Sequence, residues 1–159
     1  PSRCIGFGGQ LDSARFGQEL KKRLIPGKAY VLGDHGEFQV PLFSRLKKSV
    51  PTPLREDILT QLRGASMEII RGKGGTVFGP AYHIADLIRS IVEDKKATKV
   101  CSCILDGEYG LSSCSLGVPV KVGRDGISEI LEWKLDAWER THFENAGEFV
   151  TGLCTQLGV

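Results

Sequence analysis

The sequence of 159 residues has no apolar run approaching 18 residues, and its only methionine is Met67. A helix that spans a membrane needs about 20 consecutive apolar residues, so we predict no membrane span. No secretory signal peptide is recognisable. The chain starts at Pro1 without an initiator methionine and enters the apolar stretch Cys4–Phe7 at once. We therefore expect it to be a piece of a longer polypeptide.

Paired cysteines are also lacking. The five cysteines are scattered, no Cys-x-x-Cys pair occurs, and the three histidines lie far apart. These features argue against a disulfide framework and against a zinc site, so we predict no metal. Cys101 and Cys103 alternate along a strand-like run, which predicts two small buried apolar groups on one face. Reduced thiols fit a cytoplasmic location.

A concentrated basic surface is missing as well. The formal net charge is +2, and acidic residues surround most of the short basic runs. Nucleic-acid binding needs a basic stripe with interleaved aromatic residues, so we predict no nucleic-acid partner. The length suits one domain with a real core.

Hydrophobic periodicity predicts an α+β domain, with a mainly antiparallel sheet packed against long helices. Apolar residues recur at helical spacing in four segments: 11–24, 55–70, 77–94 and 135–157. Strand patterns bounded by glycine turns occupy six segments: 3–7, 28–33, 37–42, 99–105, 118–122 and 127–132. Prolines make 41–53 irregular, with room for a short helix. Hairpin-like connections argue against a nucleotide-binding Rossmann unit, which needs parallel strands.

Two glycine-rich stretches invite comparison with phosphate loops. Gly72–Thr76 opens a helix but does not match G-x-x-x-x-G-K-[ST], so we interpret it as a break between helices with Thr76 capping the second. The glycines of Gly6–Gly9 are also a weak match. There we expect close approach to something bound next to the predicted strand.

Three polar side chains carry the functional hypothesis: Asp12, Arg15 and His35. Taken alone, Asp12 fits a helix cap, Arg15 its salt-bridge partner at i+3, and His35 an exposed turn residue. Together the three side chains could bind a carboxylate substrate and transfer one proton to or from it. A guanidinium grips a carboxylate through two hydrogen bonds, an imidazole exchanges protons near neutral pH, and a carboxylate fixes the imidazole tautomer.

Five motifs, in order along nearly the whole chain, give the sequence a family resemblance. They are Ile5–Phe16 (IGFGGQLDSARF), Leu32–Glu37 (LGDHGE), Gly74–Ala81 (GGTVFGPA), Leu105–Gly110 (LDGEYG) and Gly117–Gly123 (GVPVKVG). The sequence resembles the malate and lactate dehydrogenase family, in particular its C-terminal substrate domain. Phe78–Ala81 is most similar to malate dehydrogenases of the archaeal or bacterial kind.

The resemblance implies a role for each site residue. His35 is the proton donor and acceptor, Asp12 is its carboxylate partner, Arg15 clamps the substrate carboxylate, and Thr76 lies near the substrate. One departure is mild, since the usual His-Gly-Asp is His35-Gly36-Glu37 here. The larger departure is that residues 1–159 form only the substrate-binding and catalytic domain, without the Rossmann domain that holds NAD or NADP.

The expected parent protein is thus a 2-hydroxy-acid dehydrogenase, most similar to malate dehydrogenase. Its ligand would be a small 2-hydroxy or 2-oxo acid, and its assembly a homodimer or homotetramer. L-Lactate as substrate and a catalytically silent dimerisation or interaction module remain open alternatives. The isolated chain is expected to be inactive.

Overall fold

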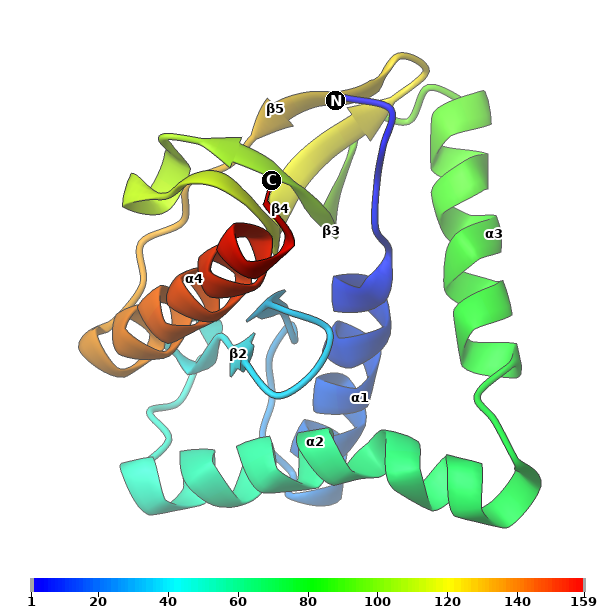
Figure 1. Cartoon of the computed structure of the whole chain (residues 1–159). Helices are drawn as coiled ribbons and strands as arrows, with labels where there is room; N and C mark the ends of the chain where they lie inside the picture. Colours follow the sequence, from blue (N-terminus) through cyan, green and yellow to red (C-terminus); the bar gives the residue numbers. More distant parts are fainter. Residues whose placement is uncertain (1, 159) are drawn as a thin grey trace.

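The computed structural model describes residues 2–158 as four long helices around a five-stranded sheet (Figure 1). In chain order the elements are α1 (Gly8–Lys22), β1 (Val31–Gly33), β2 (Gln39–Pro41), the 3-10 helix η1 (Phe43–Arg45), α2 (Thr52–Lys73), α3 (Phe78–Val92), β3 (Ala97–Asp106), the 3-10 helix η2 (Glu108–Gly110), β4 (Ser112–Gly123), β5 (Gly126–Ile130) and α4 (Ala137–Leu157). All strand pairings are antiparallel. The predicted α+β class with an antiparallel sheet is confirmed.

The centre of the sheet is the long hairpin of β3 and β4, in which Val100 pairs with Pro119 and Cys103 pairs with Leu116. Both strands are buried along much of their length, with α1 packed against β3 and α4 packed against β4. Cys101 and Cys103 are both buried there, as predicted. Burial raises the pKa of the Cys101 thiol to about 12, so the thiol stays neutral and acts as an apolar group.

A second core lies between α1, α2 and the short β1–β2 hairpin. Phe16 and Leu20 of α1 meet Val31 of β1 and Ile58 and Leu62 of α2. In Figure 1, α2 lies across the lower part of the molecule and α3 stands beside α1. Helix α1 packs against β3 on one side and against α2 and β1 on the other. This packing holds its polar side chains at fixed positions.

Four local predictions are wrong. Residues 3–7 are not a strand, because only Gly6 bridges to Ser102, and the first helix starts at Gly8 rather than residue 11. β4 starts at Ser112, six residues before the predicted start. The serines and glycine at its start are poor strand formers, but pairing along the whole length of β3 outweighs that preference.

The fourth wrong prediction concerns Thr76, which does not cap α3. The residue before that helix is Val77, and no side chain caps it with a hydrogen bond.

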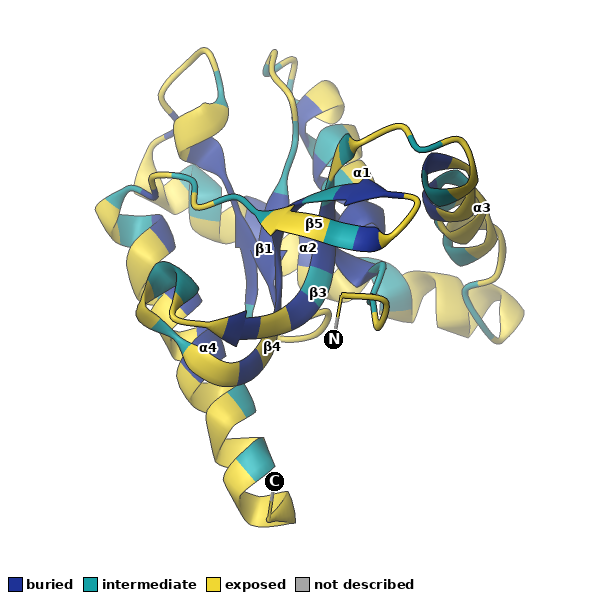
Figure 2. Ribbon diagram, turned by 90° about the horizontal axis from the view of Figure 1, so that it is seen from above, coloured by how far each residue is buried: buried dark blue, intermediate teal, exposed yellow. Residues whose placement is uncertain are grey.

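Burial is uneven among the helices (Figure 2). α3 buries only Leu87 and Ser90, although it is the most apolar of the four. Within residues 2–158, the helices are all too short or too polar to cross a bilayer.

Candidate active site

Helix α1 presents a polar stripe within the core. Gly8, Asp12 and Arg15 are separated by four and three residues, so they share one face of the helix. Asp12 is 1% exposed and Arg15 is 9% exposed, whereas charged side chains are seldom buried without a partner. The Arg15 Nη1 lies 3.4 Å from Asp12 Oδ1. The expectation that the two share a helix face is confirmed, and the cap interpretation of Asp12 is wrong because the helix starts four residues earlier.

The loop between β1 and β2 places His35 beside this face of α1. Gly33 has φ +88°, and a Cβ there would lie 2.2 Å from the Phe38 carbonyl oxygen, so only glycine allows the turn to close. The backbone N–H of Phe38 donates to Asp34 Oδ1 at 2.7 Å, which ties the loop across its base. His35 Nδ1 then lies 2.7 Å from Asp12 Oδ2. The predicted contact between the imidazole and the carboxylate is confirmed.

Asp12 sets the chemistry of His35. The hydrogen bond to the Asp12 carboxylate raises the pKa of His35 above its ordinary value, and this exceeds the opposing effects of burial and of nearby Arg15. Because Nδ1 faces Asp12, the second ring nitrogen, Nε2, is directed away from the carboxylate. The His35 side chain is 46% exposed, so the ring is not enclosed by the protein.

Arg15 keeps most of its hydrogen-bonding capacity free. Among the described residues, its guanidinium contacts only Asp12, through one long bond. The remaining N–H donors of the planar fork can therefore take a carboxylate. Arg15 also lines a pocket of about 160 Å³, and Thr76 lines the same pocket.

Thr76 and His35 are not brought together. The pocket at Arg15 lies between α1 and the segment joining α2 to α3, with Ile69, Phe78 and Pro80 among its walls. His35 is not among its lining residues. Arg15 therefore contacts the Asp12–His35 pair and also lines the pocket that contains Thr76.

Comparisons with known proteins show the family to which the chain belongs. A family model described as lactate/malate dehydrogenase, alpha/beta C-terminal domain, matches residues 10–151. The malate dehydrogenase of Halobacterium salinarum is 43% identical over 153 residues, which cover 91% of this chain and 50% of that protein. This chain belongs to the lactate/malate dehydrogenase family.

Two further relatives of the family show how widely the likeness extends. The L-lactate dehydrogenase of Oceanobacillus iheyensis is 32% identical over 170 residues, covering 96% of this chain and 53% of that protein. The malate dehydrogenase of Archaeoglobus fulgidus, solved in complex with NADH, has a TM-score of 0.88 and 30% identity, covering 100% of this chain and 54% of that one. The chain spans about half the length of the curated relatives it matches.

The sequence predicted that the glycines of Gly6–Gly9 allow close approach to something bound beside a strand. In the structure, Gly8 and Gly9 instead make room for other parts of the protein. A Cβ at Gly8 would lie 2.5 Å from His35 Cγ, and a Cβ at Gly9 would lie 2.5 Å from Val100 Cγ1. The two glycines therefore let the start of α1 fit between the His35 loop and β3. The spacing Gly-x-x-x-Asp-x-x-Arg in the sequence indicates that Gly8 belongs to the site, because it places Gly8 on the same helix face as Asp12.

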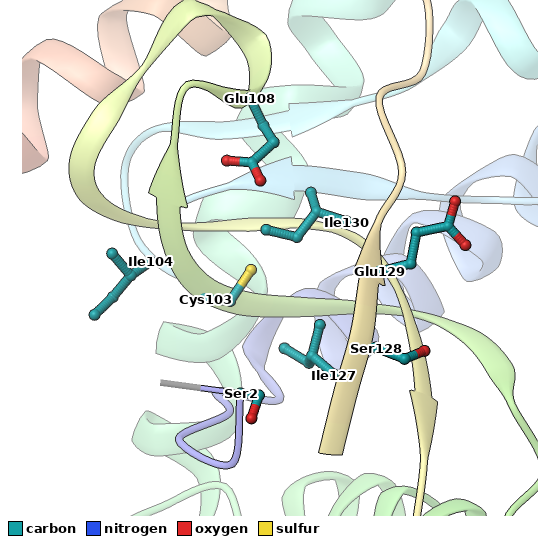
Figure 3. A pocket seen from close by; sticks show the side chains of 8 residues that line it. All are labelled: Ser2, Cys103, Ile104, Glu108, Ile127, Ser128, Glu129 and Ile130. Atoms are coloured by element: carbon teal, nitrogen blue, oxygen red, sulfur yellow. The ribbon is translucent and has the colours of Figure 1, made fainter. Parts of the chain in front are cut away.

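A second pocket of this domain does not suit an anionic substrate. It has a volume of about 290 Å³ and lies beside β3 and β5, where Glu108 and Glu129 contribute carboxylates (Figure 3). Its remaining walls are Ser2, Cys103, Ile104, Ile127, Ser128 and Ile130. With two acidic side chains and no basic one, this pocket would repel a carboxylate.

The chain has two other histidines, His83 and His142. His142 Nδ1 bonds the Trp138 carbonyl at 2.8 Å, and its ring stacks on the Trp138 ring, which is a structural role. His83 lies on α3, and burial lowers its pKa. Across residues 2–158, His, Cys, Asp and Glu side chains form no group of three or more that could hold a metal ion.

Proposed function

We propose that this chain is the substrate-binding and catalytic half of a nicotinamide-dependent 2-hydroxy-acid dehydrogenase that acts on malate. The observation that carries the proposal is the arrangement around Asp12. One nitrogen of His35 is held by a buried carboxylate at 2.7 Å, and the guanidinium of Arg15 lies beside it with donors to spare. The relative from H. salinarum bears the name malate dehydrogenase, which favours malate.

The residues perform the proton half of the reaction. Arg15 holds the substrate carboxylate through two parallel hydrogen bonds. His35 Nε2 accepts the proton of the C2 hydroxyl as the alcohol is oxidised, and Asp12 stabilises the imidazolium that forms. In the reverse direction, protonated His35 donates that proton to the carbonyl oxygen of the 2-oxo acid. The raised pKa of His35 favours this charged form.

The described residues do not fit a nicotinamide dinucleotide by themselves. A dinucleotide site needs a parallel strand, a glycine loop and a helix whose N-terminus meets the pyrophosphate. Here the strand pairings are antiparallel, and Gly74 follows a helix rather than a strand. We therefore assign NAD or NADP, and the hydride chemistry it supplies, to the part of the parent protein that this chain does not span.

Residues 1–159 are proposed as one substrate domain of a cytoplasmic protein. All five cysteines are free in the structure, which supports a reducing compartment. The two cores both include residues of β1, and α1 of the second core packs against β3 of the first, which supports a single unit.

The parent protein is further proposed to be a homodimer or homotetramer, with α3 in a two-fold contact. Large apolar side chains of α3 face solvent, with Phe78 at 79%, Tyr82 at 70% and Ile88 at 54% exposure. Helix neighbours within residues 2–158 cover only one stripe of α3, so the other stripe is free for a second subunit. We expect the contact to bury more than about 1,000 Å².

Sedimentation of the full-length protein at tens of micromolar tests the assembly. Ile88→Asp is expected to shift the protein toward monomer, because it places a charge in the contact. Ile104→Asp is the matched control, since Ile104 is 58% exposed on β3, away from α3. A wild-type protein that sediments strictly as a monomer contradicts the proposed contact.

Oxidation assays of the full-length gene product with malate and with L-lactate, each with NAD and NADP, test the proposed activity. We expect malate to be preferred and the 159-residue chain alone to show essentially no turnover, because it cannot align the cofactor with the substrate. A preference for lactate supports the alternative suggested by the O. iheyensis relative. Turnover of neither acid favours a silent interaction module, against which the intact trio of Asp12, Arg15 and His35 weighs.

A further inference from the structure

The face of α1 that meets His35 contains a glycine where the imidazole needs space. Gly8 and Asp12 lie one helical turn apart on that face. A Cβ built on Gly8 would lie 2.5 Å from His35 Cγ, 2.7 Å from His35 Cβ and 2.9 Å from His35 Nδ1. The ring of His35 thus rests against the bare backbone of Gly8 while its Nδ1 reaches Asp12 one turn further along.

Backbone conformation does not explain this glycine. Gly8 is absent from the residues of positive φ, so an L-residue could adopt its backbone angles. It is also the first residue of a helix, where alanine would ordinarily be the better helix former. The three nearest atoms that a Cβ at position 8 would meet all belong to His35. Space for the imidazole is therefore the feature that requires glycine.

We propose that Gly8 is a positioning residue. Because it has no side chain, the His35 imidazole can pack against α1 at the place where its Nδ1 forms a hydrogen bond with Asp12. The proposal deepens the proposed function and rests on it, since it concerns the same proton transfer. A methyl group at position 8 would occupy the space beside the imidazole. Its contacts with His35 atoms would be shorter than 3.0 Å, so the imidazole would have to move. Asp12 is fixed in the core at 1% exposure, so it cannot follow the imidazole.

The test is a pH titration of the His35 ring by NMR in the 159-residue chain. The groups that face the ring are Asp12 and Arg15 from α1 and Asp34 from its own loop. We expect the wild-type His35 pKa above its ordinary value, and a Gly8→Ala value that falls toward that of Asp12→Asn. Gly17→Ala is the matched control on the same helix, because a Cβ there meets only the Ala29 Cβ, at 3.6 Å, an ordinary contact.

A double-mutant cycle covers the case in which Gly8→Ala disturbs folding. The substitution His35→Gly removes both the ring and the Cβ that crowd position 8. If the clash with His35 is the cause, Gly8→Ala lowers the thermal midpoint in the wild-type background and no longer does so in the His35→Gly background. An equal loss in both backgrounds, or a wild-type His35 pKa in Gly8→Ala, overturns the proposal.

The full-length protein provides the last readout. A displacement of about 1 Å in a reacting group costs about 100-fold in rate, so we expect Gly8→Ala to lower turnover by about that factor and to change KM much less, since Arg15 stays in place. The NMR result does not depend on dehydrogenase activity. Failure of malate and lactate oxidation would therefore overturn the proposed function alone, whereas an unchanged His35 pKa would overturn the role of Gly8 alone.

Discussion

Two carboxylates are buried among residues 2–158, that of Asp12 in α1 at 1% exposure and that of Glu139 at the start of α4 at 0%. Glu139 Oε1 accepts the Ser44 backbone N–H at 2.7 Å, and its Oε2 accepts the Ser44 hydroxyl at 2.7 Å and the Asp136 backbone N–H at 3.0 Å. Asp12 instead contacts only side chains, those of His35 and Arg15.

The partners explain why one carboxylate is structural and the other is a candidate for chemistry. The donors around Glu139 are used up by holding η1 to the first turn of α4, where Asp136 and Glu139 form a capping box. The partners of Asp12 are the ionisable side chains of His35 and Arg15. Each of them has a further hydrogen-bond donor directed away from the Asp12 carboxylate. A buried carboxylate therefore marks a functional site when its partners have donors left for a ligand.

The strongest test of this contrast is His35→Asn in the full-length protein. We expect turnover to fall by about 10²–10⁴-fold, because the general acid–base group is lost. His142→Asn is the control, since His142 bonds only a helix carbonyl and stacks on Trp138. A rate near that of the wild type for His35→Asn would remove the proton-transfer role.

Arg15→Lys sharpens the same contrast at the second partner. Lysine keeps the charge but loses the planar fork, so we expect 2-oxo-acid binding to weaken by about 10–100-fold while nicotinamide binding is retained. Competition binding and KM measurements report the change. Arg63→Lys, on the exposed side of α2, serves as control. Equal losses for cofactor and substrate would contradict a carboxylate clamp.

Glu139→Gln tests the structural carboxylate. The amide group of glutamine turns a donor toward backbone donors, so we expect a loss of about 1–3 kcal/mol in the free energy of unfolding, measured by urea denaturation of the chain. Glu148→Gln on the exposed face of the same helix should change it by less than about 0.5 kcal/mol. The contrast fails if Glu139→Gln leaves stability unchanged.

The smallest expected effect is a pH dependence of stability at His35. Its folded-state pKa is raised, so its contribution is fully present below its unfolded pKa and is lost as pH rises through the raised value. The difference in unfolding free energy between wild type and His35→Gln should therefore shrink as pH rises from below 6.5, the ordinary value, through the raised folded-state pKa of His35. Solvent screening keeps the change small, because the ring is half exposed. A difference that grows with pH would reverse the assigned sign.

The sequence was informative wherever a local rule dominates. Helical spacing predicted α2, α3 and α4 to within a few residues, and the glycine-flanked turn predicted the hairpin that carries His35. The motif Asp136-x-x-Glu139 is a capping-box pattern that could have identified the structural carboxylate, but it was not singled out. The start of β4 was missed, since its serines signal a strand only once β3 lies beside them.

By itself, then, the sequence determined the fold class, the family and the face of α1 that bears Asp12 and Arg15, because these depend on periodicity and on motifs of adjacent residues. Only the tertiary structure decided that Gly8 makes the space in which His35 meets Asp12, 23 residues away. It also decided that Thr76 lies by Arg15 and caps no helix. Such contacts depend on how the hairpin packs against the helix, and no local preference specifies that packing.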